Sequence, residues 1–519
     1  MKPKQLLLVC ASLLLSVNIF SQVAGMLDKN FGNKGIAQIS VVLANGDTAV
    51  DAPLISQLSN GKFIVAVIAS GSSHIDGYIY RLNNNGSVDN AFGNKGRVLV
   101  YSAVNSGLIY FYFNDLLIDS NDNIILSEYV SQLGNDGFTI VRLKKDGQYD
   151  SSFNRKGIKV IIKNTYLLLD NAVALRPSGK ILVSTSYVHR KPHERPSDTT
   201  IQYQFRNDGS LDTSFNGKGY VGSGDKFEFS SMGVQPDGRV IYGGNYLEQL
   251  NFNGMQNLNF ADTGTIRMFT WGYMYYIQMM QDGKFMCLVN AKGISSNKDV
   301  TKLIKFNKNG KLDSALNSSG ILPIYNTGLP NDGLAFASNV IVQPNGKFLV
   351  NISDADNIHS KIRRYLSDGK IDSTFAQNGV IKTSYKINQI ILQKNFKIVA
   401  VQGAHFSDRT DTNYFYVYRY YNDVVNSNIS SSTPSEIKVI KTNSSIKISP
   451  NPVNGVLNIQ GLTANTRMII INSNGEKLAS RVATSSSYKW NIQNLPADNY
   501  FLIASQNNKI IASLQFIKE

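Results

Sequence analysis

LDTSFNGKG, residues Leu211–Gly219, is one of seven related nine-residue phrases in this chain. The other six are LDKNFGNKG, VDNAFGNKG, YDSSFNRKG, QNLNFADTG, LDSALNSSG and IDSTFAQNG, which begin at Leu27, Val88, Tyr149, Gln256, Leu312 and Ile371. The central position is Phe in six copies and Leu316 in the seventh, and successive central positions are 61, 61, 62, 45, 56 and 59 residues apart. This period predicts one supersecondary unit that is repeated along the chain.

Each period also contains a polar turn between two strand-like runs, as in ISQLSNGKFIVAV (Ile55–Val67) and VIVQPNGKFLVN (Val340–Asn351). Asn-Gly or Asp-Gly between apolar runs predicts a β-hairpin, because the turn needs positive φ angles. A third strand-like run precedes the phrase and a fourth follows its last glycine, as in GRVLVYS (Gly96–Ser102). Seven units of four strands predict an all-β fold, a seven-bladed β-propeller of four-stranded blades.

The two ends of the repeat region predict that the ring is closed by the chain's own first strand. The region begins with a phrase and a fourth-type strand, Ile36–Val42, and ends near Tyr421 after only three strands. The first strand can therefore complete the last blade, which removes open sheet edges.

The phrase itself is interpreted as a structural turn. Its Asp can accept hydrogen bonds from nearby backbone N–H groups, its Phe can pack between blades, and its last Gly permits positive φ. A catalytic site is needed once, whereas these residues recur, so no catalytic residue is assigned. The structural repeat positions are Asp28, Phe31, Gly35, Asp89, Phe92, Gly96, Asp150, Phe153, Gly157, Asp212, Phe215, Gly219, Asp313, Gly320, Asp372, Phe375 and Gly379.

The phrase and its hairpin resemble the delta-60 repeat, a bacterial propeller-type repeat, over roughly residues 25–423. That family implies the propeller fold and little biochemistry. The fifth copy departs from the pattern, with Asn257 in place of Asp and a short spacing of 45 residues. We therefore expect trimmed loops in its blade.

The N-terminus predicts export. A short basic start is followed by an apolar run, Leu6–Phe20, which is typical of a secretory signal peptide cleaved between Ser21 and Gly25. The run is shorter than the roughly 18 residues of a membrane span, so no span is predicted. Cys287 is the one cysteine beyond that segment, which leaves no intrachain disulfide, and its apolar surroundings predict a buried thiol.

The composition gives weak information about partners. The 519 residues are 42% hydrophobic and 17% charged, with a formal net charge of +15. A basic surface suits acidic polysaccharide, lipopolysaccharide or nucleic acid. The lysines and arginines are spread through every repeat without a basic helix, which favours solvation and weak attraction to anionic surfaces. We predict no nucleic-acid partner, and we expect a monomer.

The last part of the chain predicts a second, small β domain. A Ser/Thr/Asn-rich linker covers residues 424–445, and several short strand-like runs with turns follow in residues 446–519. This pattern predicts a small Ig-like β-sandwich.

This segment resembles the type A C-terminal sorting domain of type IX secretion cargo from Bacteroidetes. The resemblance rests on ISPNPVNGVLNIQGL (Ile448–Leu462), on Trp490, Leu495-Pro496 and Tyr500, and on the terminal Phe516-Ile517-Lys518. It implies recognition by the type IX secretion machinery and delivery through the periplasm to the outside or to the outer cell surface. The residues assigned to the sorting signal are Pro450, Asn451, Pro452, Gly455, Gly475, Phe516 and Lys518.

A search for catalytic and metal motifs gives no strong match. No nucleophile elbow, phosphate loop, zinc signature or Rossmann fingerprint is present, so neither a cofactor nor a metal site is assigned. His189 and His193 are four residues apart, but Pro192 between them excludes a regular helix. Asp119–Asn123 and Asp354–Asn357 have oxygen ligands at calcium-like spacing, yet the first lacks the glycine and distal glutamate of a calcium loop and occupies a hairpin-turn position.

One set of residues gathers where binding is expected. All five histidines lie between the second and third strands of their units, and aromatic stretches lie between the fourth and first. In a four-stranded meander these connections emerge on one face, and loops on a rigid scaffold often bind ligands. The candidate ligand-binding residues are His74, His189, His193, His359, His405, Tyr110, Tyr112, Trp271 and Tyr273.

These inferences divide the chain into a signal peptide (1–24), a propeller (25–423), a linker (424–445) and a sorting domain (446–519). The predicted function is a non-catalytic exported protein that binds a glycan, such as surface lipopolysaccharide, or a protein ligand. Two alternatives stay open: a carbohydrate-active enzyme, a glycosidase or lyase on a propeller scaffold, and a purely structural surface protein. A glycosidase generally needs two flanking carboxylates, and Glu128, Glu194 and Glu248 have no supporting context.

Overall fold

The computed structural model divides into two compact units, Met1–Ser427 and Asn428–Glu519, which are described separately. It describes residues 24–41, 49–71, 74–104, 109–132, 135–161, 167–189, 197–223, 229–268, 272–292, 299–324, 336–354, 358–403, 414–422, 446–472, 477–496, 498–506 and 509–518.

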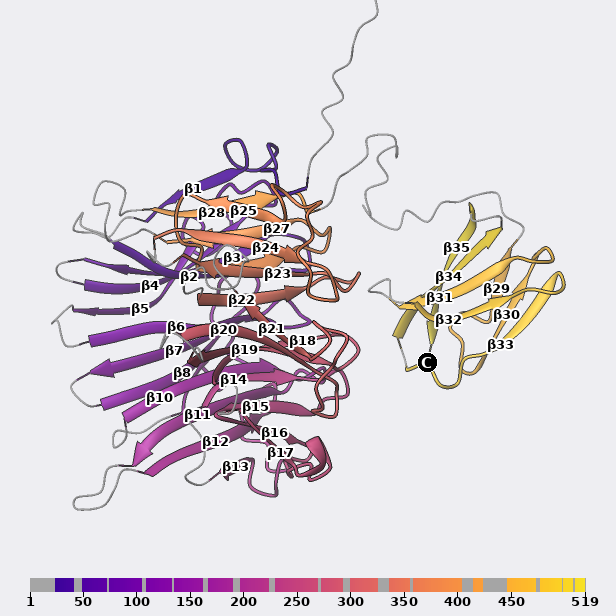
Figure 1. Ribbon diagram of the computed structural model, residues 1–519. Coiled ribbons are helices and arrows are strands. Elements are labelled where there is room, and N and C mark those ends of the chain that lie inside the picture. The colour runs from indigo at the N-terminus through magenta and orange to yellow at the C-terminus, as the bar shows by residue number, and fades with distance from the viewer. Residues whose placement is uncertain are drawn as a thin grey trace, which may run out of the picture. The chain divides into compact units, whose positions relative to one another are not determined.

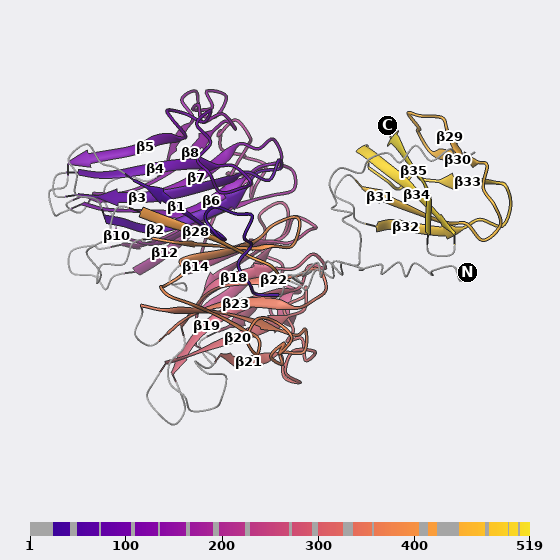
Figure 2. The same ribbon diagram turned by 90° about the horizontal axis from the view of Figure 1, so that it is seen from above.

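The first unit contains seven four-stranded antiparallel sheets, as the sequence predicts (Figures 1 and 2). Blade 1 is β2 (Ala49–Gln57), β3 (Phe63–Ser70), β4 (His74–Leu82) and β5 (Arg97–Val104); blade 2 is β6 (Ile109–Ile118), β7 (Ile124–Gln132), β8 (Asn135–Leu143) and β9 (Ile158–Val160). Blade 3 is β10 (Leu167–Leu175), β11 (Ile181–His189), β12 (Ser197–Phe205) and β13 (Tyr220–Ser223); blade 4 is β14 (Phe229–Val234), β15 (Val240–Gly244), β16 (Tyr246–Leu250) and β17 (Thr265–Arg267).

The remaining three blades follow the same order. Blade 5 is β18 (Tyr273–Met279), β19 (Phe285–Lys292), β20 (Asp299–Phe306) and β21 (Ile321–Ile324); blade 6 is β22 (Phe336–Val342), β23 (Phe348–Ser353), β24 (Ser360–Tyr365) and β25 (Val380–Thr383). Blade 7 is β26 (Gln389–Leu392), β27 (Ile398–Gln402), β28 (Tyr414–Tyr420) and β1 (Ile36–Ser40). The helix η1 (Phe260–Asp262) lies within the fifth phrase.

The N-terminal strand closes the ring, as predicted from the chain ends. Strand β1 pairs antiparallel with β28, from Ile36 opposite Tyr418 to Ser40 opposite Tyr414. Just before it, Gly25 donates a backbone hydrogen bond to Tyr421 O, and Tyr421 donates one to Met26 O. The last blade is therefore assembled from both ends of the unit.

The first strands of the seven blades (β2, β6, β10, β14, β18, β22 and β26) contact one another in a closed cycle and are here called the inner strands. They all run from one end of the propeller to the other. We call the end where the inner strands begin, and where second strands lead to third strands, the loop face. The opposite end, which holds the hairpin turns and the phrases, is the turn face.

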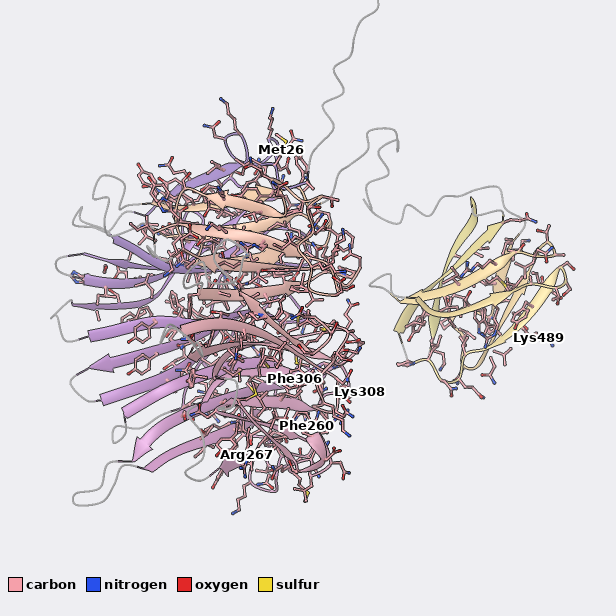
Figure 3. All side chains as sticks on the ribbon, in the orientation of Figure 1. Met26, Phe260, Arg267, Phe306, Lys308 and Lys489 are labelled. Atoms are coloured by element: carbon pink, nitrogen blue, oxygen red, sulfur yellow. The ribbon has the colours of Figure 1, made fainter. Side chains whose placement is uncertain are left out.

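Apolar side chains fill the spaces between neighbouring blades. Figure 3 shows Phe260 and Phe306 among the side chains of the lower blades, and both belong to one buried cluster between blades 4 and 5. Cys287 lies in the same cluster with no exposed surface, and burial raises the pKa of its thiol. The predicted buried thiol is confirmed.

The second unit consists of two small antiparallel sheets. One is β29 (Lys447–Ser449), β30 (Val456–Gln460) and β33 (Ser487–Asn491); the other is β32 (Lys477–Val482), β31 (Arg467–Asn472), β34 (Asp498–Gln506) and β35 (Lys509–Lys518). Leu457 and Trp490 of the first sheet share a buried cluster with Met468, Leu502 and Phe516 of the second. The two sheets thus face each other across one core, as in a sandwich.

Candidate functional site

The repeated aspartates on the turn face act as buried turn caps. In each intact copy the Asp carboxylate accepts a hydrogen bond from the backbone N–H two residues later, at 3.0–3.3 Å. All six aspartates are less than 9% exposed. In the structure these carboxylates cap the backbone of the turn.

Each aspartate also forms ion pairs, which the sequence pattern does not indicate. Asp28 contacts Lys397 Nζ and Arg419 Nε, both at 2.7 Å, and accepts a hydrogen bond from the hydroxyl of Tyr421. Burial alone would raise the pKa of Asp28. The hydrogen bonds from Lys397 and Tyr421, together with the charge of Arg419, lower this pKa to about 2. The corresponding cations in the other blades are Lys62 and Arg81, Arg142, Lys180 and Arg206, Lys284 and Lys305, and Lys347 and Arg364.

The phrase also joins each blade to the next one. The residue after its central Phe or Leu donates a backbone hydrogen bond of 2.6–3.1 Å to the following blade at all seven junctions, as from Gly93 to Asp146 O. The central side chains have no exposed surface. The Arg81 guanidinium lies 4.8 Å from the centre of the Phe92 ring and also donates to the Lys145 carbonyl of blade 2. The repeated residues therefore hold the ring together.

The degraded fifth copy has Asn257 in place of the aspartate, and Arg239 of the hairpin turn donates to Gln249 Oε1 at 3.1 Å instead of to a carboxylate of the phrase. Asn257 donates a 2.5 Å hydrogen bond to Gln249 Oε1, at the position where blade 3 has Gln204 and the remaining blades have an Arg or Lys. Strands β15 and β16 of this blade are joined by the single residue Asn245, as expected for trimmed loops.

The central channel has a volume of about 850 Å³ and is lined by all seven inner strands. Six of these strands contain a β-bulge. In five blades, the side chain four residues before the start of the hairpin turn bonds to the next inner strand. These contacts are Gln389 to Ile55 N (2.7 Å), Asp115 to Val173 N (2.8 Å), Ser231 to Ile277 N (3.1 Å), Tyr276 to Val340 O (3.5 Å) and Asn339 to Ile390 O (3.0 Å). Much of the channel's polar lining thus connects blades.

Asp115 is the single carboxylate among the described residues that line the channel. Burial raises the pKa of Asp115 to about 6, although the Val173 N–H and the Ser127 hydroxyl lower it. The described part of the lining therefore shows no second carboxylate that could pair with it.

A second buried acid, Glu128, lies between blades 1 and 2 on β7 and is 5% exposed. Its Oε1 has no hydrogen-bond partner in the described structure, and burial raises the pKa of this carboxyl to about 8. In alignment on the hairpin turn, blades 1, 5 and 6 have Val67, Val289 and Ile352 at this position. The burial of Glu128 could not be predicted from the sequence, because it depends on how the two blades pack.

The predicted histidine sites are only partly described. His74 begins β4 and His359 immediately precedes β24, and both are exposed near the loop face. The backbone of His189 ends β11 on the same face. His193, His405 and Trp271 lie outside the described residues. The structure brings no group of three or more His, Cys, Asp or Glu residues into metal-binding proximity within its described ranges.

Three aromatic residues share one position near the mouth of the channel. Tyr112, Tyr273 and Phe336 each lie seven residues before the residue that opens the hairpin turn in blades 2, 5 and 6. Tyr112 is 45% exposed and Phe336 is 49% exposed, while Tyr273 is partly buried. The ring of Tyr112 stacks on Tyr129 with centroids 5.1 Å apart. The sequence pattern alone does not indicate Phe336, which follows a stretch with no aromatic motif.

The aromatic stretches differ in one respect from the expectation that they form loops. Residues 109–113 belong to β6 and residues 273–276 to β18. Alternation explains this, because Phe111 and Phe113 are buried between blades while Tyr112 is exposed. The Asp119 turn likewise binds its own backbone, through Asn121 N and Asn123 N at 2.8 and 2.9 Å.

Comparison with protein-family models supports both predicted resemblances. Residues 447–519 match the secretion system C-terminal sorting domain, and residues 58–92 match the domain of unknown function (DUF5122) beta-propeller. No curated protein matches the sequence. The chain is therefore a propeller protein that is secreted through the type IX system, to the outside or the outer cell surface.

The similar solved structures are distant. A chain of Chaetomium thermophilum Polycomb Repressive Complex 2 is 9% identical, with 75% of this chain and 98% of that chain covered and a TM-score of 0.40. Polysaccharide lyase Uly1 is 9% identical, with 76% and 93% covered and a TM-score of 0.39. PorZ, a type IX surface component of Porphyromonas gingivalis, is 8% identical, with 93% and 100% covered and a TM-score of 0.18. At these scores the similarities support no functional inference.

The sorting domain implies interaction with the secretion machinery. Among the described residues no helix has the length and apolar character that a membrane crossing requires.

Proposed function

We propose that this protein is a non-catalytic, monomeric binding protein whose loop face holds a glycan or protein ligand outside the cell. The observation that carries the proposal is the equivalent placement of Tyr112, Tyr273 and Phe336 near the loop-face mouth of the channel. Two of these side chains are 45% and 49% exposed, although each is large and apolar. Exposed aromatic residues on a rigid scaffold are typical binding anchors.

The contrast with the turn face supports this assignment. Phe252 and Phe396, which lie in turns outside the phrases, are 52% and 47% exposed. The repeated charged and aromatic side chains of the phrases, by contrast, are buried and satisfied by one another, as in the Asp28, Lys397 and Arg419 cluster. They are not available to a ligand unless the ring opens. Variation between blades is concentrated at the loop face, which is the arrangement expected of a binding surface.

A glycan array probed with the full secreted protein tests the binding role. We expect one class of glycan to bind, and we expect the triple variant Tyr112→Ala, Tyr273→Ala, Phe336→Ala to lose it. A protein ligand would instead be found by cross-linking on intact cells, with the same variant as the control. Absence of any ligand by both methods, together with absence of turnover, would favour a purely structural role.

Export can be tested separately by removing residues 446–519. We expect this truncated protein to fold and to accumulate in the periplasm, because the sorting domain is lost. Fractionation with a surface-protease assay would detect it. Arrival of the truncated protein at the cell surface would contradict the role of the tail.

A further inference from the structure

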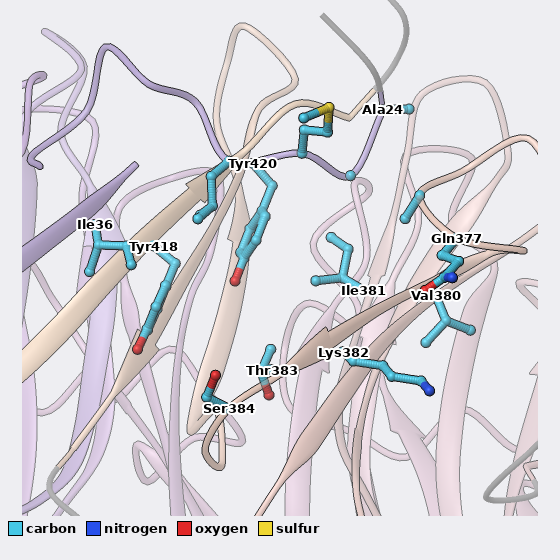
Figure 4. A pocket seen from close by; sticks show the side chains of 14 residues that line it. Ala24, Ile36, Gln377, Val380, Ile381, Lys382, Thr383, Ser384, Tyr418 and Tyr420 are labelled. Carbon is cyan, nitrogen blue, oxygen red and sulfur yellow. The ribbon is translucent and has the colours of Figure 1, made fainter. Parts of the chain in front are cut away.

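A groove of about 550 Å³ lies between blades 6 and 7, away from the channel (Figure 4). Strand β25 of blade 6 forms one wall, with Lys382 and Thr383, followed by Ser384. Strands β28 and β1 of blade 7 form the other wall, with Tyr418, Tyr420 and Ile36. The volume is within the range of about 300–1,000 Å³ that is usual for small-ligand sites.

The aromatic wall is part of a ladder of four tyrosines on β28. Tyr414, Tyr416, Tyr418 and Tyr420 alternate along the strand, with successive ring centroids 6.3, 6.4 and 6.3 Å apart. The rings of Tyr418 and Tyr420 are nearly parallel, with an interplanar angle of 13°. In blade 2 the equivalent positions are Val141 and Leu143, which are buried between blades. Blade 3 has Tyr203 and Phe205 at these two positions, with ring centroids 6.1 Å apart, so the aromatic pair recurs in part, whereas the run of four tyrosines is a feature of β28.

The two groove tyrosines differ in how their hydroxyl groups are used. Tyr418 donates a 2.7 Å hydrogen bond to Gln402 Oε1. Tyr420 is 6% exposed, and its hydroxyl has no hydrogen-bond partner among the described residues. Figure 4 shows the hydroxyls of Tyr418 and Tyr420 directed toward the side of the groove where Thr383 and Ser384 lie. A buried phenol that faces a groove is a donor available to a ligand.

The charge of the groove is positive. Lys382 is exposed on β25 and forms no ion pair with any residue that the structure describes. None of the described lining residues is acidic. Across the strand pair, Lys361 lies opposite Lys382, and its ammonium is already neutralised by Asp354 at 2.7 Å. Figure 4 shows the Lys382 side chain extending away from Tyr418 and Tyr420, so the two walls suit a ligand that spans the groove, with an apolar ring face at one end and a negative group at the other.

We propose that this groove binds an acidic saccharide. Tyr418 packs against the C–H face of a sugar ring, the Tyr420 hydroxyl donates to a ring or hydroxyl oxygen, and Lys382 pairs with a carboxylate or sulfate group. The inference rests on the proposed function in that it takes a glycan as the ligand, but it places that glycan on a different surface. The net charge of +15 favours the approach of such a polyanion.

The test is calorimetric titration of the full secreted protein with hexagalacturonate and with its methyl ester, which keeps the sugar rings and removes the charge. We expect the acid to bind about fivefold to tenfold more tightly than the ester, with a difference that shrinks at high salt. Lys382→Gln should abolish that difference. Lys394→Gln, an equal change of charge at an exposed turn lysine, should leave it intact. Tyr420→Phe should weaken both ligands by about threefold, because one neutral hydrogen bond is lost.

The outcomes separate this inference from the loop-face proposal. The inference is overturned if hexagalacturonate, a heparin hexasaccharide and a sialylated glycan all fail to bind the wild-type protein. It is also overturned if Lys382→Gln behaves like Lys394→Gln, or if the loop-face triple variant alone abolishes binding. If the triple variant still binds the acid, and Lys382→Gln loses the difference in affinity between the acid and its ester, the groove is supported. The loop-face proposal is then tested separately with the glycan array.

Discussion

The turn face of the propeller repeats the same chemistry from blade to blade, whereas the loop face and the groove between blades 6 and 7 do not. On the turn face, a buried aspartate, a cation and a central apolar side chain recur, and each has a partner within the protein. On the loop face, exposed aromatics stand at one register in only some blades. The comparison teaches that repetition marks the residues that hold the ring, and that departures from it mark residues available for binding.

The largest effect is expected at the ring closure, with Asp28→Ala. The variant should lose about 3–5 kcal/mol of unfolding free energy, because Arg419 would stay buried without its carboxylate. Since Asp28 has its pKa lowered to about 2 from 3.8, the stabilisation is complete above pH 4 and is lost as the pH falls toward 2. Guanidinium chloride unfolding measures the change.

A surface pair provides the control for this prediction. Lys370 and Asp368 are 3.2 Å apart but 81% and 46% exposed, so Lys370→Gln should cost less than about 0.5 kcal/mol. If Asp28→Ala costs no more than Lys370→Gln, the turn face does not hold the ring as argued.

The next effect concerns Glu128, an acid where blades 1, 5 and 6 have an aliphatic residue. Its pKa is raised to about 8 from 4.5, so the folded state retains a proton that the unfolded state has released. Wild-type stability should therefore fall as the pH rises from about 4.5 to 8. Glu128→Gln should be more stable than wild type by about 2–4 kcal/mol at pH 8 and nearly equal at pH 4. Urea unfolding at both pH values checks this, and parallel curves for the two proteins would contradict it.

A smaller effect is expected in the degraded copy. Asn257→Asp places a carboxylate against Gln249 instead of a cation and should cost about 1–2 kcal/mol. The double variant Asn257→Asp, Gln249→Arg creates the Asp–Arg pair of blades 1, 2, 6 and 7 and should recover most of that loss. Thermal unfolding of the three proteins decides between this outcome and simple additivity, which would mean that the positions are not coupled.

The smallest stability effect is expected on the loop face. Tyr112→Ala, Tyr273→Ala and Phe336→Ala together should lower the unfolding free energy by about 1 kcal/mol, because the exposed rings gain little from burial. The same variant should lose ligand binding. A loss of stability as large as that of Asp28→Ala would mean that these aromatics are part of the core, and the contrast between the two faces would fail.

Much of this architecture could be predicted because it depends on local patterns. Asn-Gly turns such as Asn60-Gly61 require positive φ, and the structure has Gly61 at 85°. The phrase glycines, such as Gly35 at 102°, follow the same rule. The missing fourth strand of the last unit predicted that β1 would pair with β28, and it does.

The candidate sites could be predicted only in part. The sequence indicated Tyr112 and Tyr273 from aromatic stretches, but the alternation that buries Phe111 and exposes Tyr112 depends on which neighbour each strand face meets. Phe336 belongs with them only through the common inner-strand register. The groove could not be predicted, because its walls are β25 and β28, which belong to different blades and face each other only in the folded propeller.

By itself, the sequence determined the number of blades, the turns between strands, the closure by the first strand and the export tail, because each depends on residues that are close in the chain or repeated along it. The tertiary structure alone decided which cation neutralises each aspartate, that Glu128 is buried without a partner for Oε1, and that Tyr420 and Lys382 line one groove. Those facts depend on contacts between residues of different strands and blades, and a one-dimensional pattern does not record which faces meet.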